Sequence, residues 1–171
     1  MALRKIIKMP NSFLRKKASA VDTIDNDIKH ILDDMLETMY NANGIGLAAT
    51  QIGIDKRLIV MDCSSDDEDP NLIKMINPEI IFSSTEISEL EEGCLSIPEH
   101  KSIVKRPSNI KVKFLNIEGL EEIIDAEGLL SACIQHEIDH LNGVLFVDHI
   151  SRLKRDIILR KVKKQIRENE K

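Results

Sequence analysis

Residues 135–143 read Gln-His-Glu-Ile-Asp-His-Leu-Asn-Gly, and this stretch organises the rest of the chain. On a helix, His136 and His140 lie on one face about 6 Å apart along the axis, close enough to bind one metal ion. Glu137 lies beside them as a possible general base. The competing interpretation is a surface helix with two histidines. Apolar residues before the motif favour a half-buried helix, and Gly143 is typical of a helix end. Two histidines and two carboxylates on a half-buried helix need a reason, which favours metal binding.

The segments around this helix follow two different hydrophobic periods. Residues 28–40 have helical spacing and end at Asn-Ala-Asn-Gly. Five runs of apolar and β-branched residues predict strands at 57–62, 73–82, 102–106, 110–116 and 121–125. Because helices and strands do not alternate regularly, we expect an α+β fold, with mostly antiparallel β-sheets packed around the central helix that carries His-Glu-Ile-Asp-His.

The composition is that of an ordinary globular protein. With 171 residues, 42% hydrophobic and 31% charged, the chain is expected to form one domain over residues 1–171. Three cysteines, an odd number, argue against a disulfide framework and favour a reducing compartment. The first ten residues lack the apolar stretch of a signal peptide, and no run reaches transmembrane length. These features predict a cytoplasmic protein.

Positive charge is concentrated at the end of the chain. Residues 152–171 hold nine Lys or Arg against three acidic residues, a net charge of +6, which leaves −11 for the remainder. Leu153, Ile157, Val162 and Ile166 recur at helical spacing and predict an amphipathic C-terminal helix whose apolar stripe packs on the body. Its basic outer face is expected to contact RNA or another anion.

Two histidines cannot complete a metal site, so a third ligand must come from elsewhere. The candidates are Cys63, Cys94, Cys133, His30, His100, His149 and the carboxylates. Cys133 shares the helical face, but it lies about 7 to 8 Å along the axis from the midpoint of the histidines, too far for a thiolate. Cys133 is therefore expected to line a pocket or the core. Cys94, in Glu-Gly-Cys-Leu-Ser, is the favoured ligand.

A third motif, Gly-Ile-Gly-Leu-Ala-Ala-Thr-Gln at residues 44–51, has no nucleotide-binding pattern. A helix stop and a tight turn would explain its glycines but not Gln51. A side-chain amide at the end of a small, apolar loop is suited to donate a hydrogen bond to a carbonyl oxygen.

In chain order, the motifs at 44–51, around Cys94 and at 135–143 resemble the signature of the peptide deformylase family. The resemblance extends over nearly the whole chain. It implies a cytoplasmic hydrolase that removes the formyl group from N-terminal formyl-methionine of new polypeptides and releases formate. It implies metal ligation by Cys94, His136 and His140. It also implies acid/base chemistry by Glu137.

The resemblance further implies that Gln51 and the backbone N–H of Leu95 stabilise the developing oxyanion. Substrate binding is expected to involve Ile45, Gly46, Gly93, Leu129 and Cys133. The implied cofactor is one Fe(2+) per chain, for which zinc, nickel or cobalt can substitute. The expected partners are formyl-methionyl nascent peptides and, through the basic helix, the ribosome, with no membrane and no DNA.

Some positions outside the motifs bear on these expectations. Lys101 stands where many family members carry arginine, so the preference for residues beyond methionine stays open. Glu92 and Asp139 are candidates to orient a metal-binding histidine or to pair with Arg106, with surface solvation as the alternative.

Two other functions fit parts of the pattern. A zincin-type metallopeptidase would use the same helix, although a cysteine would be an unusual third ligand. A non-catalytic metal-binding or RNA-docking module would leave Glu137 and Gln51 without a role.

Overall fold

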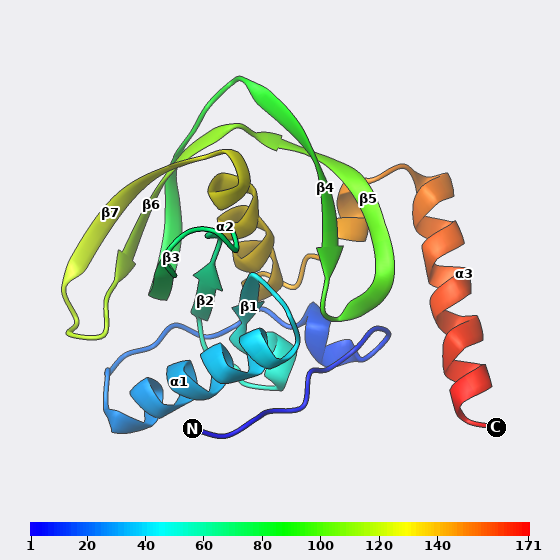
Figure 1. The fold of residues 1–171 in the computed structure, drawn as a ribbon, viewed down its shortest axis with the longest axis horizontal. Coiled ribbons are helices and arrows are strands. Elements are labelled where there is room, and N and C mark those ends of the chain that lie inside the picture. Colours follow the sequence, from blue (N-terminus) through cyan, green and yellow to red (C-terminus); the bar gives the residue numbers. More distant parts are fainter.

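A computed structural model describes all residues, 1–171, and shows two antiparallel β-sheets around a central helix, α2 (Gly128–Leu141) (Figure 1). The larger sheet has the strand order β1-β2-β3-β6-β7. Its strands are β1 (Gly46–Ala48), β2 (Leu58–Asp62), β3 (Leu72–Ser83), β6 (Asn109–Leu115) and β7 (Glu121–Glu127). The smaller sheet pairs β4 (Ile87–Cys94) with β5 (Ile97–Pro107). The predicted α+β fold is confirmed.

Strand β2 explains why the core has two sides. All five of its residues are buried, as expected for a strand that is covered on both faces. Because side chains alternate across a strand, Ile59 and Met61 pack in the cluster that contains α2. Leu58 and Val60 point the other way, into the cluster formed with α1 (Asn26–Asn41). The sheet is therefore held between the two helices.

Helix α1 confirms the helix predicted over 28–40 and begins two residues earlier. The side chain of Asp25 accepts a hydrogen bond from the backbone N–H of Ile28 at 2.9 Å and caps the first turn. The helix ends at Asn41, and the Asn43-Gly44 turn leads into β1. This turn delivers the Gly-Ile-Gly motif to the pocket that is described below.

The hairpin of β4 and β5 differs from the sequence prediction. No strand was expected over 87–94, and β5 was expected only at 102–106. The acidic residues of β4 hide its strand character, because alternate positions face solvent while Glu92 is buried through an ion pair. The long hairpin carries Cys94 to the end of α2.

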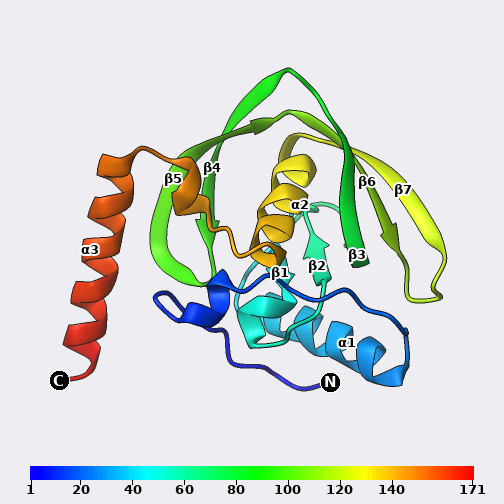
Figure 2. The ribbon, with the colours of Figure 1, turned by 180° about the vertical axis from the view of Figure 1, so that it is seen from behind.

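The C-terminal helix, α3 (Arg152–Asn169), lies at the edge of the molecule beside β5 in both views (Figures 1 and 2). The predicted helix is present, but the predicted apolar stripe is wrong in part. Leu153 and Ile157 are 68% and 40% exposed, whereas Ile158 and Val162 are buried. The buried line is thus Ile158, Val162 and the partly buried Ile166, an i, i+4, i+8 row. None of the helices is both long and apolar enough to cross a membrane.

Candidate metal centre and peptide pocket

The structure brings Cys94 together with the two histidines of α2. The Nε2 atom of His140 lies 3.2 Å from the Cys94 Sγ and 3.2 Å from the His136 Nε2. Ligand atoms held about 2.0 to 2.3 Å from one ion at tetrahedral angles are separated by about 3.3 to 3.6 Å. The three side chains therefore fit a single metal ion. No other group of three metal-binding side chains converges in this way.

The other candidate ligands lie elsewhere. Cys133 lines the pocket, where its Sγ lies 3.8 Å from the carbonyl oxygen of Ile45. His30 is exposed on α1, and His149 contacts the Asp139 carboxylate at 2.7 Å. Cys133 thus lies in the pocket wall and not among the candidate ligands, as its distance along the helix predicts.

A buried ion pair orients His136. The Glu92 Oε2 lies 3.0 Å from the His136 Nδ1, and the Arg106 Nε donates to the Glu92 Oε1 at 2.6 Å. Arg106 also donates to Asp139 at 2.8 Å. Burial alone would raise the pKa of Glu92, but hydrogen bonds with His136 and Arg106 lower it to about 2. The ionised carboxylate accepts a hydrogen bond from the Nδ1–H of His136, so the Nε2 lone pair faces the candidate centre.

His140 is held in a different environment. The ring is fully buried, and its Nδ1 has no hydrogen-bond partner. Burial, which disfavours the charged imidazolium, holds the pKa of His140 well below its usual range. The ring is therefore neutral, which is the form that binds a metal ion.

Glu137 lies beside the cluster without binding a neighbour. Its Oε2 is buried with no hydrogen-bond partner, and burial raises its pKa to about 7. A carboxyl group with this pKa can take up and release a proton near neutral pH. Gly46 packs directly against it, since a Cβ atom at Gly46 would lie 2.7 Å from the Glu137 Oε1 and 2.9 Å from the Cys133 Sγ. Only glycine fits this position without displacing one of the two side chains.

Gln51 is fixed at both ends of its amide. The Oε1 atom accepts a hydrogen bond from the backbone N–H of Ala48 at 2.9 Å, which leaves the NH₂ group directed at the site. That group donates to the Ser96 hydroxyl at 3.1 Å and lies 3.6 Å from the Cys94 Sγ. Ser96 was not among the predicted site residues, although it belongs to the same Glu-Gly-Cys-Leu-Ser motif.

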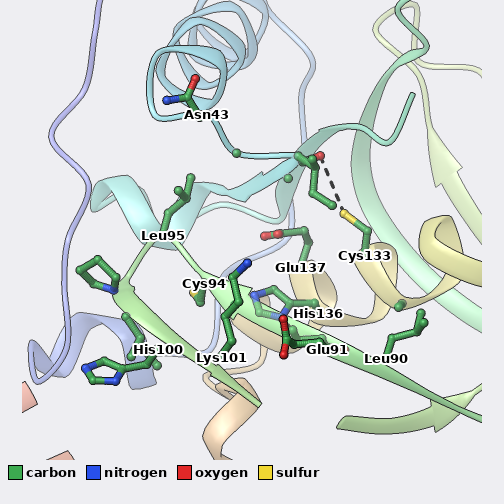
Figure 3. Close-up of a pocket in the computed structure, with 18 of the residues that line it drawn as sticks. Asn43, Leu90, Glu91, Cys94, Leu95, His100, Lys101, Cys133, His136 and Glu137 are labelled. Carbon is green, nitrogen blue, oxygen red and sulfur yellow. Dashed lines mark hydrogen bonds and ion pairs between the residues drawn. The ribbon is translucent and has the colours of Figure 1, made fainter. Parts of the chain in front are cut away.

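These groups open onto a cavity of about 710 Å³. Figure 3 shows Cys133 and His100 toward opposite ends of the view, with Cys94, Glu137 and His136 between them. All the predicted substrate-binding residues line this cavity: Ile45, Gly46, Gly93, Leu129 and Cys133. Gln51 and Leu95 line it as well. The volume is within the range of pockets that enclose a whole small ligand.

A cysteine and two histidines around one point, beside a buried carboxyl group, define a metal-dependent hydrolase. Comparison with known proteins makes the class specific. The chain belongs to the polypeptide deformylase family, whose model matches residues 3–156. This membership goes against the zincin-type alternative.

Individual relatives cover nearly the whole chain. The peptide deformylase of Rhizobium meliloti (strain 1021) is 52% identical over 164 residues, which is 96% of this chain and 94% of that protein. A crystal structure of a peptide deformylase from Legionella pneumophila has a TM-score of 0.91 and 45% identity, with 99% of both chains covered. The Ehrlichia chaffeensis enzyme in complex with actinonin has a TM-score of 0.92 and 41% identity, covering 96% of this chain and 98% of that one.

Proposed function

We propose that this protein removes the formyl group from the N-terminal formyl-methionine of newly synthesised polypeptides by metal-dependent hydrolysis and releases formate. The observation that carries the proposal is the convergence of Cys94, His136 and His140 beside Glu137, at a cavity with an apolar end. The cytoplasm is the proposed location, because new chains are made there.

The methionine side chain is assigned to the apolar end of the cavity, next to Ile45, Leu129 and Cys133. With the side chain there, the formyl group lies toward the metal ligands. The backbone at Gly46 and Gly93 has no side chain in the way and can approach an extended peptide closely.

Cys94, His136 and His140 would hold the metal ion. When bound, such an ion lowers the pKa of a coordinated water and polarises a carbonyl oxygen. Glu137 accepts the proton of the attacking water and later delivers it to the departing amine. The Gln51 NH₂ group and the Leu95 backbone N–H donate to the oxygen on which negative charge develops. Gln51 needs no reorganisation for this, because Ala48 already fixes its amide.

One assay tests the activity against the peptidase alternative. Formate release is measured from formyl-Met-Ala and compared with the cleavage of an internally quenched peptide. We expect formate from the first and no cleavage of the second. Glu137→Gln is the matched catalytic control, which should keep the metal and lose nearly all formate release. Cleavage of the internal peptide without formate would contradict the proposal.

The ligand set is tested by metal content. Cys94→Ser should purify with little metal, whereas Cys133→Ser should keep it, because the Cys133 thiol points to the Ile45 carbonyl instead. Fe(2+) is the proposed ion, as the family resemblance implies, although zinc also suits this donor set. Metal analysis of protein purified without oxygen identifies the ion. A metal-free Cys133→Ser variant would place the site elsewhere.

We also propose a salt-sensitive contact between α3 and the ribosome. The body of the chain is acidic, so ribosomal RNA would repel it, while residues 152–171 carry +6. Four exposed basic residues of α3 are replaced by Gln: Arg160, Lys161, Lys164 and Arg167. Co-sedimentation with ribosomes should weaken at low salt, and the binding that remains should depend less on salt than that of the unchanged protein. The control replaces four exposed lysines elsewhere: Lys5, Lys29, Lys105 and Lys111. Equal loss in both variants would overturn the contact through α3.

A further inference from the structure

The start of β5, just after the turn from β4, contains three residues that form no ladder pairs with β4. Gly93 pairs with Lys101, but the next residue, Cys94, pairs with Ile97. Residues 98–100 are therefore bulged out, with no partners in the ladder. Within the bulge, Glu99 has a positive φ of 70°, a conformation that side-chain-bearing residues rarely adopt and that the surroundings must maintain.

The C-terminal helix supplies that support through one side chain. The Gln165 NH₂ group donates to the Glu99 carboxylate at 2.8 Å, and the Gln165 Oε1 lies 3.3 Å from the His100 Nε2. An amide oxygen only accepts hydrogen bonds, so this contact assigns the hydrogen to the His100 Nε2. One amide thus holds two consecutive residues of the bulge with both of its polar atoms.

The bulge is also a wall of the peptide cavity. Pro98, Glu99 and His100 line it. His100 lies on the side away from Cys133 (Figure 3). If methionine occupies the end near Cys133 and the formyl group lies at the ligands, these residues are free to meet the chain that follows methionine. A cavity of about 710 Å³ is larger than one methionine residue requires.

Attachment of α3 does not by itself require Gln165. Ile158 and Val162 are buried in the cluster that contains Ile97 and Phe146, and this apolar contact already fixes the helix. An apolar residue at position 165 could pack equally well but would leave Glu99 and His100 unsupported.

We propose that Gln165 is a positioning residue that holds Glu99 and His100 as a subsite for peptide residues downstream of formyl-methionine. The proposal rests on the proposed deformylase function and deepens it, because it links the length of the substrate to the C-terminal helix. A dipeptide is too short to reach the subsite, so only longer substrates sense Gln165.

The experiment measures kcat and KM of the metal-loaded, full-length protein on formyl-Met-Ala and on formyl-Met-Ala-Ser-Ala. Gln165→Leu removes both hydrogen bonds and nearly keeps the volume. We expect KM for the tetrapeptide to rise about 5- to 10-fold, the effect of losing one hydrogen bond between the unsupported subsite and the peptide. The kcat values and the KM for formyl-Met-Ala should not change. Lys161→Leu, an exposed position on α3, is the matched control and should change nothing.

A second variant separates the two contacts. Gln165→Lys keeps a donor for Glu99 and loses the acceptor for His100, so it should recover part of the tetrapeptide KM. No recovery would remove Glu99 from the subsite. An unchanged KM in Gln165→Leu, or equal changes for both substrates, would overturn the inference and leave the deformylase function standing. A wild-type protein that released no formate from either peptide would overturn both.

Discussion

Helices α2 and α3 are similar in length but differ in almost every physical respect. Ten of the fourteen residues of α2 are buried, including both histidines and Glu137. Only two of the eighteen residues of α3 are buried. Side chains of α2 are surrounded by the two sheets and by Arg106, whereas α3 rests on the body along one line. The proposed chemistry requires fixed geometry and exclusion of water, and α2 offers both.

The difference in burial also explains why charged groups behave differently on the two helices. On α2, the polar groups are desolvated, so each needs a specific partner and its pKa departs from the usual range when the partner is missing. On α3, water solvates the charges and ion pairs add little. Charged residues therefore contribute differently to the free energy of unfolding on α2 and on α3. Mutations can measure this difference.

The largest effect is expected where α2 meets the hairpin. Arg106→Leu removes the cation that holds Glu92 and Asp139, and it leaves the buried Glu92 carboxylate with only its contact to His136. Breaking such a pair typically costs about 3 to 5 kcal/mol of unfolding free energy. Denaturant unfolding measures it. Lys105→Leu, at the preceding position in β5, breaks only the exposed pair with Glu89 and should cost less than about 1 kcal/mol. Similar losses of unfolding free energy in both variants would mean that burial does not set the strength of these ion pairs.

The next effect concerns the end of α2. Gly143 has a φ of +74°, and a Cβ there would lie 2.3 Å from the carbonyl oxygen of Arg15. Gly143→Ala combines left-handed strain with a backbone clash, so it should lose about 2 to 4 kcal/mol. Gly119→Ala shares the positive φ, but its nearest neighbour would be 3.8 Å away. This control isolates the strain and should lose only about 1 to 2 kcal/mol in the same unfolding experiment. Equal losses would mean that the Arg15 clash is relieved by movement.

A smaller effect tests which face of α3 is attached. Ile158→Ala should cost about 2 kcal/mol, near the lower end for a buried isoleucine, because the site lies close to the surface. Leu153→Ala should cost less than about 0.5 kcal/mol, since that side chain is 68% exposed. Thermal or denaturant unfolding of the two variants compares them directly. A larger loss for Leu153→Ala than for Ile158→Ala would mean that α3 packs through the apolar stripe predicted from the sequence.

The smallest effect is expected for the charges of α3. Lys164 pairs only with Glu168, at 3.9 Å and with both side chains mostly exposed. Lys164→Ala should therefore change the unfolding free energy by less than about 0.5 kcal/mol. A loss comparable to that of Arg106→Leu would abolish the distinction between the two helices.

Much of the fold was predictable because its signals are local. Helix α1 and the continuous apolar run of β2 were both recognisable from neighbouring residues. Strand β4 was missed because its buried Glu92 depends on Arg106, fourteen residues away. The stripe of α3 was assigned partly to the wrong row because two apolar rows are present, and only the body decides which one packs.

The sequence by itself determined how the polar side chains of α2 lie relative to one another. The spacing of His136 and His140 is fixed by the helical repeat, and Glu137 accompanies them as the next residue along the chain, so these relations hold in any helix. It also excluded Cys133 by reach alone.

Only the tertiary structure decided what surrounds those residues. It brought Cys94 to the histidines, placed Glu92 and Arg106 behind His136, packed Gly46 against Glu137, and joined Gln165 to the pocket rim. Each of these contacts joins residues far apart in the chain. Such distances depend on how the sheets and helices pack as a whole, and no local spacing in the sequence encodes them.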